Sequence, residues 1–182
     1  MTELLKPKNL SALTYQGFQR AQVNVSRDAQ SHLCRELLHY WDRLRGAIAM
    51  PNLEDLKLDQ LGSVASWLTL KEIKVAETGE VVYTNLYWGE SLSQKLGFDG
   101  NNHDLSDYSG TRGGQAMSTI YGFVIEHVAP ILSSGFLEFV EGCEDVGYEA
   151  IFLPLASKGS RFPSHIIAAY DFSYEPDLTA TA

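Results

Sequence analysis

Residues 148–172 constrain the fold most, because two apolar runs flank a polar connector there. The first run reads Y-E-A-I-F-L-P-L, the second reads H-I-I-A-A-Y-D-F, and residues 156–164 lie between them. This pattern predicts an antiparallel hairpin with a long loop. Pro154 has no amide hydrogen for a strand ladder, so it predicts an edge position or a bulge. A hairpin this apolar also needs further strands and a covering helix.

An apolar stripe marks residues 27–45 as a helix. Its side chains recur at helical spacing at Ala29, Leu33, Leu37, Trp41 and Leu44. Ser26 is the expected N-cap and Gly46 the expected stop. The stripe must be buried, either on the sheet of the same chain or against a second copy. Leu33, Leu37, Trp41 and Leu44 are therefore the predicted docking or dimer interface.

The middle of the chain alternates between strand-type and helix-type patterns. The expected strands are 64–75, 81–88 and 136–140, and the expected helices are 90–98 and 115–132. Together with the closing hairpin, the order is two strands, a short helix, a long helix and three strands. This order predicts an α+β fold with a five-stranded antiparallel sheet, helices on one face and an N-terminal helical extension.

The first 25 residues show no strong periodicity. Ala21, Val23 and Val25 leave two interpretations open, a short strand or a packing segment. The expected organisation is an arm and amphipathic helix at 1–62, a sheet domain at 63–173 and a tail at 174–182.

The bulk properties exclude several classes of protein. The net charge of −9 disfavours binding to phosphate backbones, so no nucleic-acid partner is expected. No apolar run reaches the roughly 18 residues of a membrane span, and no signal peptide is evident, so no membrane insertion and a cytoplasmic location are expected. Cys34 and Cys143 predict two free thiols rather than a disulfide framework or a metal site.

Three segments resemble a bacterial family of small standalone PAS-like domains, formerly a domain of unknown function. They are H-Y-W-D-R-L-R-G-A-I-A-M-P at 39–51 with D-L-K-L-D-Q-L after it, Y-T-N-L-Y-W-G-E-S-L-S-Q-K-L-G-F-D at 83–99, and the closing hairpin. The resemblance covers residues 30–173 and includes the element order of the PAS fold. It implies a sensory or protein-interaction role, and it carries over no set of functional residues.

In such a fold the curved sheet and the long helix enclose a pocket. The predicted lining residues come from the second strand, the long helix and the closing hairpin: Tyr83, Asn85, Tyr87, Ile120, Tyr121, Val124, His127 and Leu153. Apolar walls with a few polar groups suit a small ligand. The alternative is that these side chains simply fill the core.

His127 shares an apolar helix face with Ile120, Val124 and Ile131. The resemblance makes haem ligation by this histidine one alternative, and a core or boundary histidine is the other. A flavin cofactor is not expected, because the Asn-Cys-Arg-Phe motif that carries the reactive cysteine of flavin-binding PAS photosensors is absent, and Cys143 lacks the local cations that would lower its pKa. No metal ligands are predicted.

The function expected from these features is a non-catalytic PAS-like sensory or interaction module in bacterial signal transduction, with a small apolar ligand as its candidate. A homodimer or a signalling protein is the expected partner. The alternatives are a haem sensor using His127 and a small cone-shaped α+β enzyme of the cyclase or isomerase type. In the latter class several helices usually precede the sheet, whereas here two strands precede the long helix.

Overall fold

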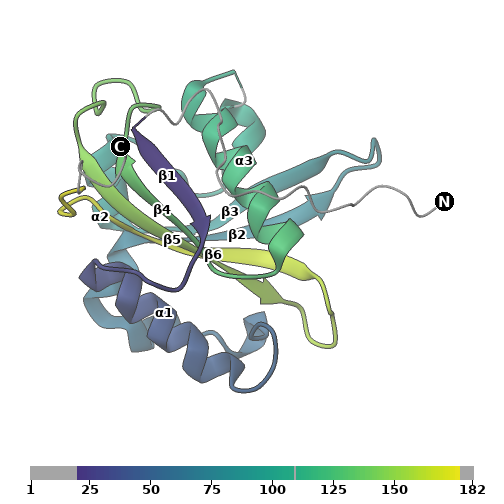
Figure 1. Ribbon diagram of the computed structural model, residues 1–182. Helices are drawn as coiled ribbons and strands as arrows, with labels where there is room; N and C mark the ends of the chain where they lie inside the picture. The colour runs from purple at the N-terminus through teal and green to yellow at the C-terminus, as the bar shows by residue number, and fades with distance from the viewer. Residues whose placement is uncertain (1–19, 109, 177–182) are drawn as a thin grey trace.

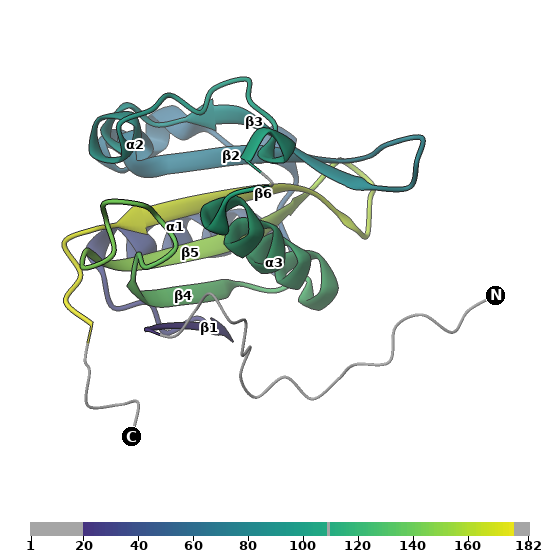
Figure 2. The same cartoon turned by 90° about the horizontal axis from the view of Figure 1, so that it is seen from above.

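One antiparallel sheet organises the protein in the computed structural model, which describes residues 20–108 and 110–176. Within those residues the sheet has six strands in the order β1-β4-β5-β6-β2-β3 (Figure 2). Their bounds are Ala21–Val25 for β1, Leu68–Val75 for β2, Val81–Trp88 for β3, Ile131–Phe136 for β4, Gly147–Ala156 for β5 and Pro163–Asp171 for β6. The predicted α+β class and antiparallel sheet are confirmed, but the predicted number of five strands is wrong.

The additional strand, β1, comes from the segment whose conformation the sequence left open. It pairs antiparallel with β4, with Ala21 opposite Gly135 and Val25 opposite Ile131. Gly135 permits this close approach, because a Cβ atom there would lie 2.2 Å from the carbonyl oxygen of Arg20. The predicted arm at 1–19 lies outside the described residues.

The segment that follows the long helix differs most from its prediction. Helix α3 spans Arg112–His127, and β4 begins at Ile131 rather than at residue 136. Val128 adopts a left-handed conformation with φ of 48° and ends the helix. Val128, Ile131 and Leu132 are apolar residues that fit the buried face of a helix as well as that of a strand. Helical periodicity alone therefore predicted a helix that is too long.

Helices cover both faces of the sheet, because the N-terminal helical extension packs on the face opposite the long helix. Helix α1, His32–Arg45, packs on one face, and α3 packs on the opposite face (Figure 1). A short helix α2, Glu90–Leu96, and three 3-10 helices complete the structure: η1 at Leu53–Asp55, η2 at Leu58–Trp67 and η3 at Leu105–Tyr108. Residues 64–67 therefore belong to η2 and not to the expected first strand. No helix in the described ranges is long and apolar enough to cross a membrane.

The apolar stripe of α1 docks on the sheet of its own chain. Leu37 and Trp41 are buried against β5 and β6, and Leu33 and Leu44 are partly buried beside them. Of the two arrangements proposed for these four residues, the structure shows docking. Because the stripe is already covered, a homodimer would need a different surface.

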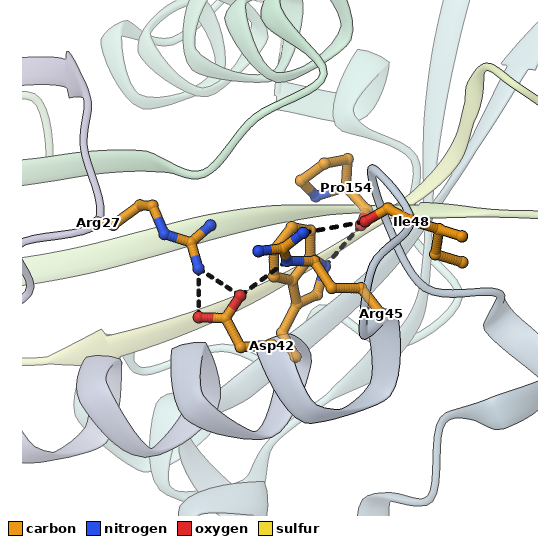
Figure 3. Close-up of polar contacts among 6 residues, drawn as sticks. Arg27, Asp42, Arg45, Ile48 and Pro154 are labelled. Atoms are coloured by element: carbon orange, nitrogen blue, oxygen red, sulfur yellow. Dashed lines mark hydrogen bonds and ion pairs between the residues drawn. The ribbon is translucent and has the colours of Figure 1, made fainter.

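Trp41 anchors α1 to the centre of the sheet. Its indole Nε1 donates a hydrogen bond of 2.8 Å to the carbonyl oxygen of Pro154, and only 2% of the residue is exposed. Asp42 accepts hydrogen bonds from both Arg27 and Arg45 (Figure 3), and both guanidinium groups lie over the Trp41 ring. Partial burial would raise the pKa of Asp42, but these two guanidinium groups outweigh it and lower the pKa.

Pro154 lies in the central strand β5, in a part of that strand that pairs with β6 on one side but extends past the end of β4 on the other. Strand β4 begins at Ile131, opposite Phe152, so β5 has no β4 partner beyond that point. The carbonyl of Pro154 is thereby open to Trp41, and the missing amide hydrogen costs no ladder bond. The predicted edge position is correct for this residue but not for the strand as a whole.

A buried carboxylate closes the N-terminus of α1, which begins five residues later than the sequence suggested. Ser31 is the N-cap, and its Oγ accepts from the amide of Cys34 at 3.4 Å. Glu149 from β5 is 1% exposed and accepts from the amides of Gln30 and Ser31 at 3.0 Å and 2.8 Å. A carboxylate at this position satisfies free amides and interacts favourably with the helix dipole.

Replacing Glu149 with glutamine is expected to destabilise the protein by about 2 kcal/mol, because charge-assisted hydrogen bonds to the helix start are weakened. Urea unfolding followed by circular dichroism measures this change. Glu36→Gln, at an exposed position of the same helix, is the matched control and should have little effect. Equal unfolding midpoints for the two variants would contradict the role assigned to Glu149.

Candidate functional site

A cavity of about 720 Å3 lies on the α3 face of the sheet. It is enclosed by α2, η3, the first turns of α3 and the segment at 137–146. Most of its walls are apolar or aromatic, with Trp88, Leu92, Phe98, Met117, Phe139 and Phe152 among them. This volume is far larger than the small voids that side-chain packing leaves in protein interiors.

Lys71 of β2 lines this cavity although only 3% of the residue is exposed. Its Nζ donates a hydrogen bond of 2.6 Å to Oδ1 of Asn85 on the neighbouring strand. The amide nitrogen of Asn85 donates in turn to the carbonyl oxygen of Gly100 at 2.7 Å, which fixes the orientation of the amide group. The Asn85 oxygen is therefore held toward the ammonium group.

Burial controls the charge of Lys71. Desolvation lowers the pKa of its ammonium group from 10.5 to about 7. No carboxylate in the described residues forms an ion pair with it. The ammonium nitrogen lies 5.2 Å from the ring centre of Trp88 and 5.3 Å from that of Tyr121, and these aromatic faces favour the cation.

Residues 98–101 hold Trp88 in the cavity wall. The side chain of Asn101 accepts from the amide of Trp88 at 2.9 Å and donates to its carbonyl oxygen at 3.2 Å. The indole packs on Phe98 with ring centres 5.1 Å apart, and Gly100 lies directly against it. The indole Nε1 is buried and has no acceptor in the part of the chain that the structure describes.

Charged residues also line the outer part of the cavity. Arg112 and Glu141 are exposed, and Glu144 is partly buried beside them. Arg112 belongs to the first turn of α3, whose N-cap Thr111 accepts from the amide of Gly114 at 3.0 Å. The cavity is thus apolar in the middle, with a single cation at its inner end and mixed charges at its exposed end.

Comparisons with known proteins identify no relative of this chain, so the functional proposal rests on the geometry of the cavity. No family model, curated protein or solved structure matches the chain. The resemblance to standalone PAS-like domains therefore stays a prediction. Within the described ranges, no group of three or more histidine, cysteine, aspartate or glutamate side chains is placed to hold a metal ion. Cys34 and Cys143 are free thiols.

The structure places two of the eight predicted pocket residues, Asn85 and Tyr121, in the cavity wall. Tyr83 packs on Tyr121 with ring centres 5.0 Å apart, and Ile120 and Val124 are fully buried in the adjacent core. These three side chains support the wall without lining the space.

The other three predicted pocket residues lie elsewhere. Leu153 and Tyr87 pack on the opposite face, in the core formed with α1. His127 lies at the C-terminal end of α3 against Phe123, with ring centres 5.4 Å apart, and is not among the cavity-lining residues. A haem group in this cavity would therefore lack the axial ligand that the sequence suggested.

A β-bulge explains why Trp88 and not Tyr87 faces the cavity. Leu70 pairs with Tyr87 but Lys71 pairs with Asn85, so Leu86 is an additional residue in β3. A bulge inverts the alternation of side chains beyond it. Tyr83 and Asn85 face α3 as predicted, whereas Tyr87 turns to the α1 face and Trp88 takes its place.

Lys71 was missed because a lysine in a strand normally marks a solvent-exposed face. In L-T-L-K-E-I-K-V, the leucines suggest the buried face and Thr69 with Lys71 the exposed one. Both faces are covered here, and Thr69 is fully buried. One feature of the sequence does indicate that Lys71 is buried: it lies on the same strand face as the apolar residue Ile73.

Proposed function

We propose that this protein is a non-catalytic, PAS-like sensory module that binds a small, largely apolar molecule in the cavity beside Lys71. The observation that carries the proposal is the cavity itself, with its volume of about 720 Å3 and its aromatic walls. Pockets for small molecules usually have volumes of about 300–1,000 Å3 and are lined mainly by apolar side chains.

The element order supports the PAS-like part of the proposal. From β2 to β6 the chain has two strands, short helices, a long helix and three strands. This is the order on which the sequence-based expectation rests. In a sensor, ligand binding must also change the structure or stability of a second surface that a partner can recognise. Strands β5 and β6 separate the cavity from α1, because Phe152 faces the cavity and Leu153 faces α1.

The cavity can be tested by filling it. N-phenyl-1-naphthylamine, a neutral aromatic probe whose fluorescence rises in apolar surroundings, is expected to bind the wild-type protein once per chain. Met117→Trp places an indole in the cavity and should weaken this binding about tenfold or more, because the probe and the indole compete for the same space. Leu96→Trp fills the cavity from α2 and should have the same effect.

Ser118→Trp is the matched control, because Ser118 is the exposed neighbour of Met117 on α3. It should leave the affinity unchanged. Native mass spectrometry of freshly purified protein gives a second readout, namely the mass of any molecule retained by the wild type and lost in Met117→Trp. If the wild type does not bind the probe, or if both filling variants bind it as the wild type does, the proposed function is wrong.

A further inference from the structure

We propose that the cavity selects an organic monoanion: an apolar, partly aromatic body with one acidic group that pairs with the ammonium group of Lys71. This inference rests on the proposed function and specifies the class of ligand. It is carried by the position of a buried cation at the inner end of an otherwise apolar space.

The first argument concerns unsatisfied hydrogen-bond donors. A lysine ammonium group has three donors, and the structure shows an acceptor for one of them, the oxygen of Asn85. The indole Nε1 of Trp88 is a further buried donor for which the described residues provide no acceptor. Buried donors without partners are costly, and the Lys71 donors border space that a ligand can occupy. A ligand that brings acceptor oxygens meets this requirement.

The second argument concerns charge. An ammonium group buried without a counter-ion is unfavourable, and proteins normally pair such a group with a carboxylate. Lys71 has no such partner in the described ranges, whereas Lys74 on the same strand forms an ion pair of 2.8 Å with Glu72. An acidic ligand supplies the missing counter-ion. The faces of Trp88 and Tyr121 favour the charged form of the amine, which is the form that pairs with an anion.

The third argument limits the ligand to one negative charge. Among the described residues, Lys71 and Arg112 are the two cations that line the cavity, and Glu141 and Glu144 lie toward its exposed end. A nucleotide or polyphosphate would bring several charges to a space with a single inner cation and two nearby carboxylates. A monoanion with an apolar body places its acid at Lys71 and its remaining atoms along the walls at Leu92, Phe98 and Phe139.

Two fluorescent probes separate the acid from the apolar body. 1-Anilinonaphthalene-8-sulfonate and N-phenyl-1-naphthylamine share one aromatic skeleton, and only the first carries an anionic group. The wild-type protein is expected to bind the sulfonate about tenfold more tightly at pH 6, because a buried charge-assisted contact is worth roughly this factor. In Lys71→Met the sulfonate should lose that advantage while the affinity for the neutral probe changes little.

Lys74→Met is the control for nonspecific charge effects, since Lys74 carries the same charge three residues further along β2 and is exposed. It should retain the preference for the sulfonate. Equal binding of the two probes by the wild type, or a preference that survives in Lys71→Met, would overturn the monoanion assignment while leaving the proposed function intact. Failure of the neutral probe to bind would instead contradict the proposed function.

Discussion

Lys71→Met is expected to be more stable than the wild-type protein at pH 6 by about 2 kcal/mol. A pKa lowered from 10.5 to about 7 corresponds to about 5 kcal/mol of unfavourable burial for the charged form. Part of this gain is lost, since Asn85 would no longer have the Lys71 donor for its oxygen, which costs about 1–3 kcal/mol. Methionine fills a similar apolar volume and carries no charge.

The sign of this difference should reverse as the pH rises, because the wild type regains the cost of the buried charge whereas the variant still lacks the Lys71–Asn85 hydrogen bond. Between pH 7 and 10.5 the unfolded chain keeps a proton on Lys71 that the folded chain has released. The wild-type protein therefore gains stability with rising pH over this window, whereas Lys71→Met does not. Urea unfolding of both proteins at pH 6 and at pH 10 measures the change.

Lys74→Met serves as the control, because Lys74 is exposed, and its stability should follow that of the wild type at both pH values. If Lys71→Met is less stable than the wild type at pH 6, the ammonium group is compensated inside the chain. Such a result would remove the argument for a ligand counter-ion. A stabilised variant that has lost sulfonate binding would show that the protein keeps an unfavourable charge for its function, as functional sites often do.

Segments with one strong pattern were predicted well from the sequence. Strand β3 has the predicted bounds of 81–88, and the closing hairpin forms as β5 and β6. Helix α1 ends near the predicted residue because Gly46, with φ of 53°, allows a conformation that other residues rarely adopt. Its start was predicted too early, because Ser26 and Ser31 are equally good N-caps in the sequence, and only Glu149 from a distant strand selects Ser31.

The candidate site was predicted less well, because its geometry depends on contacts that are distant in sequence. The bulge at Leu86 places Trp88 instead of Tyr87 in the cavity wall, and no residue in this part of the sequence indicates a bulge. Leu153 and Phe152 are equally apolar, so choosing between them requires knowing which face α1 covers. Lys71 can be recognised as a site residue only when it is known that both faces of the sheet are covered and that the side-chain amide of Asn85 accepts a hydrogen bond from its ammonium group.

Trp41→Ala is expected to destabilise the protein by about 3–5 kcal/mol, because it removes a large side chain that is 2% exposed at the contact between α1 and the sheet. The carbonyl oxygen of Pro154 would also lose its hydrogen-bond donor. Trp41→Phe keeps an aromatic ring and loses the donor, so it should cost less. Urea unfolding measures the series.

The same variants distinguish docking within the chain from pairing between two copies. With the α1 stripe buried on its own sheet, the mass measured by light scattering should be the same for wild type and Trp41→Phe. His39→Ala is the control on the exposed side of α1 and should alter neither stability nor mass. A fall in mass for Trp41→Phe with unchanged unfolding would instead assign this stripe to a dimer, since a contact between chains would then depend on a residue that the fold itself does not need.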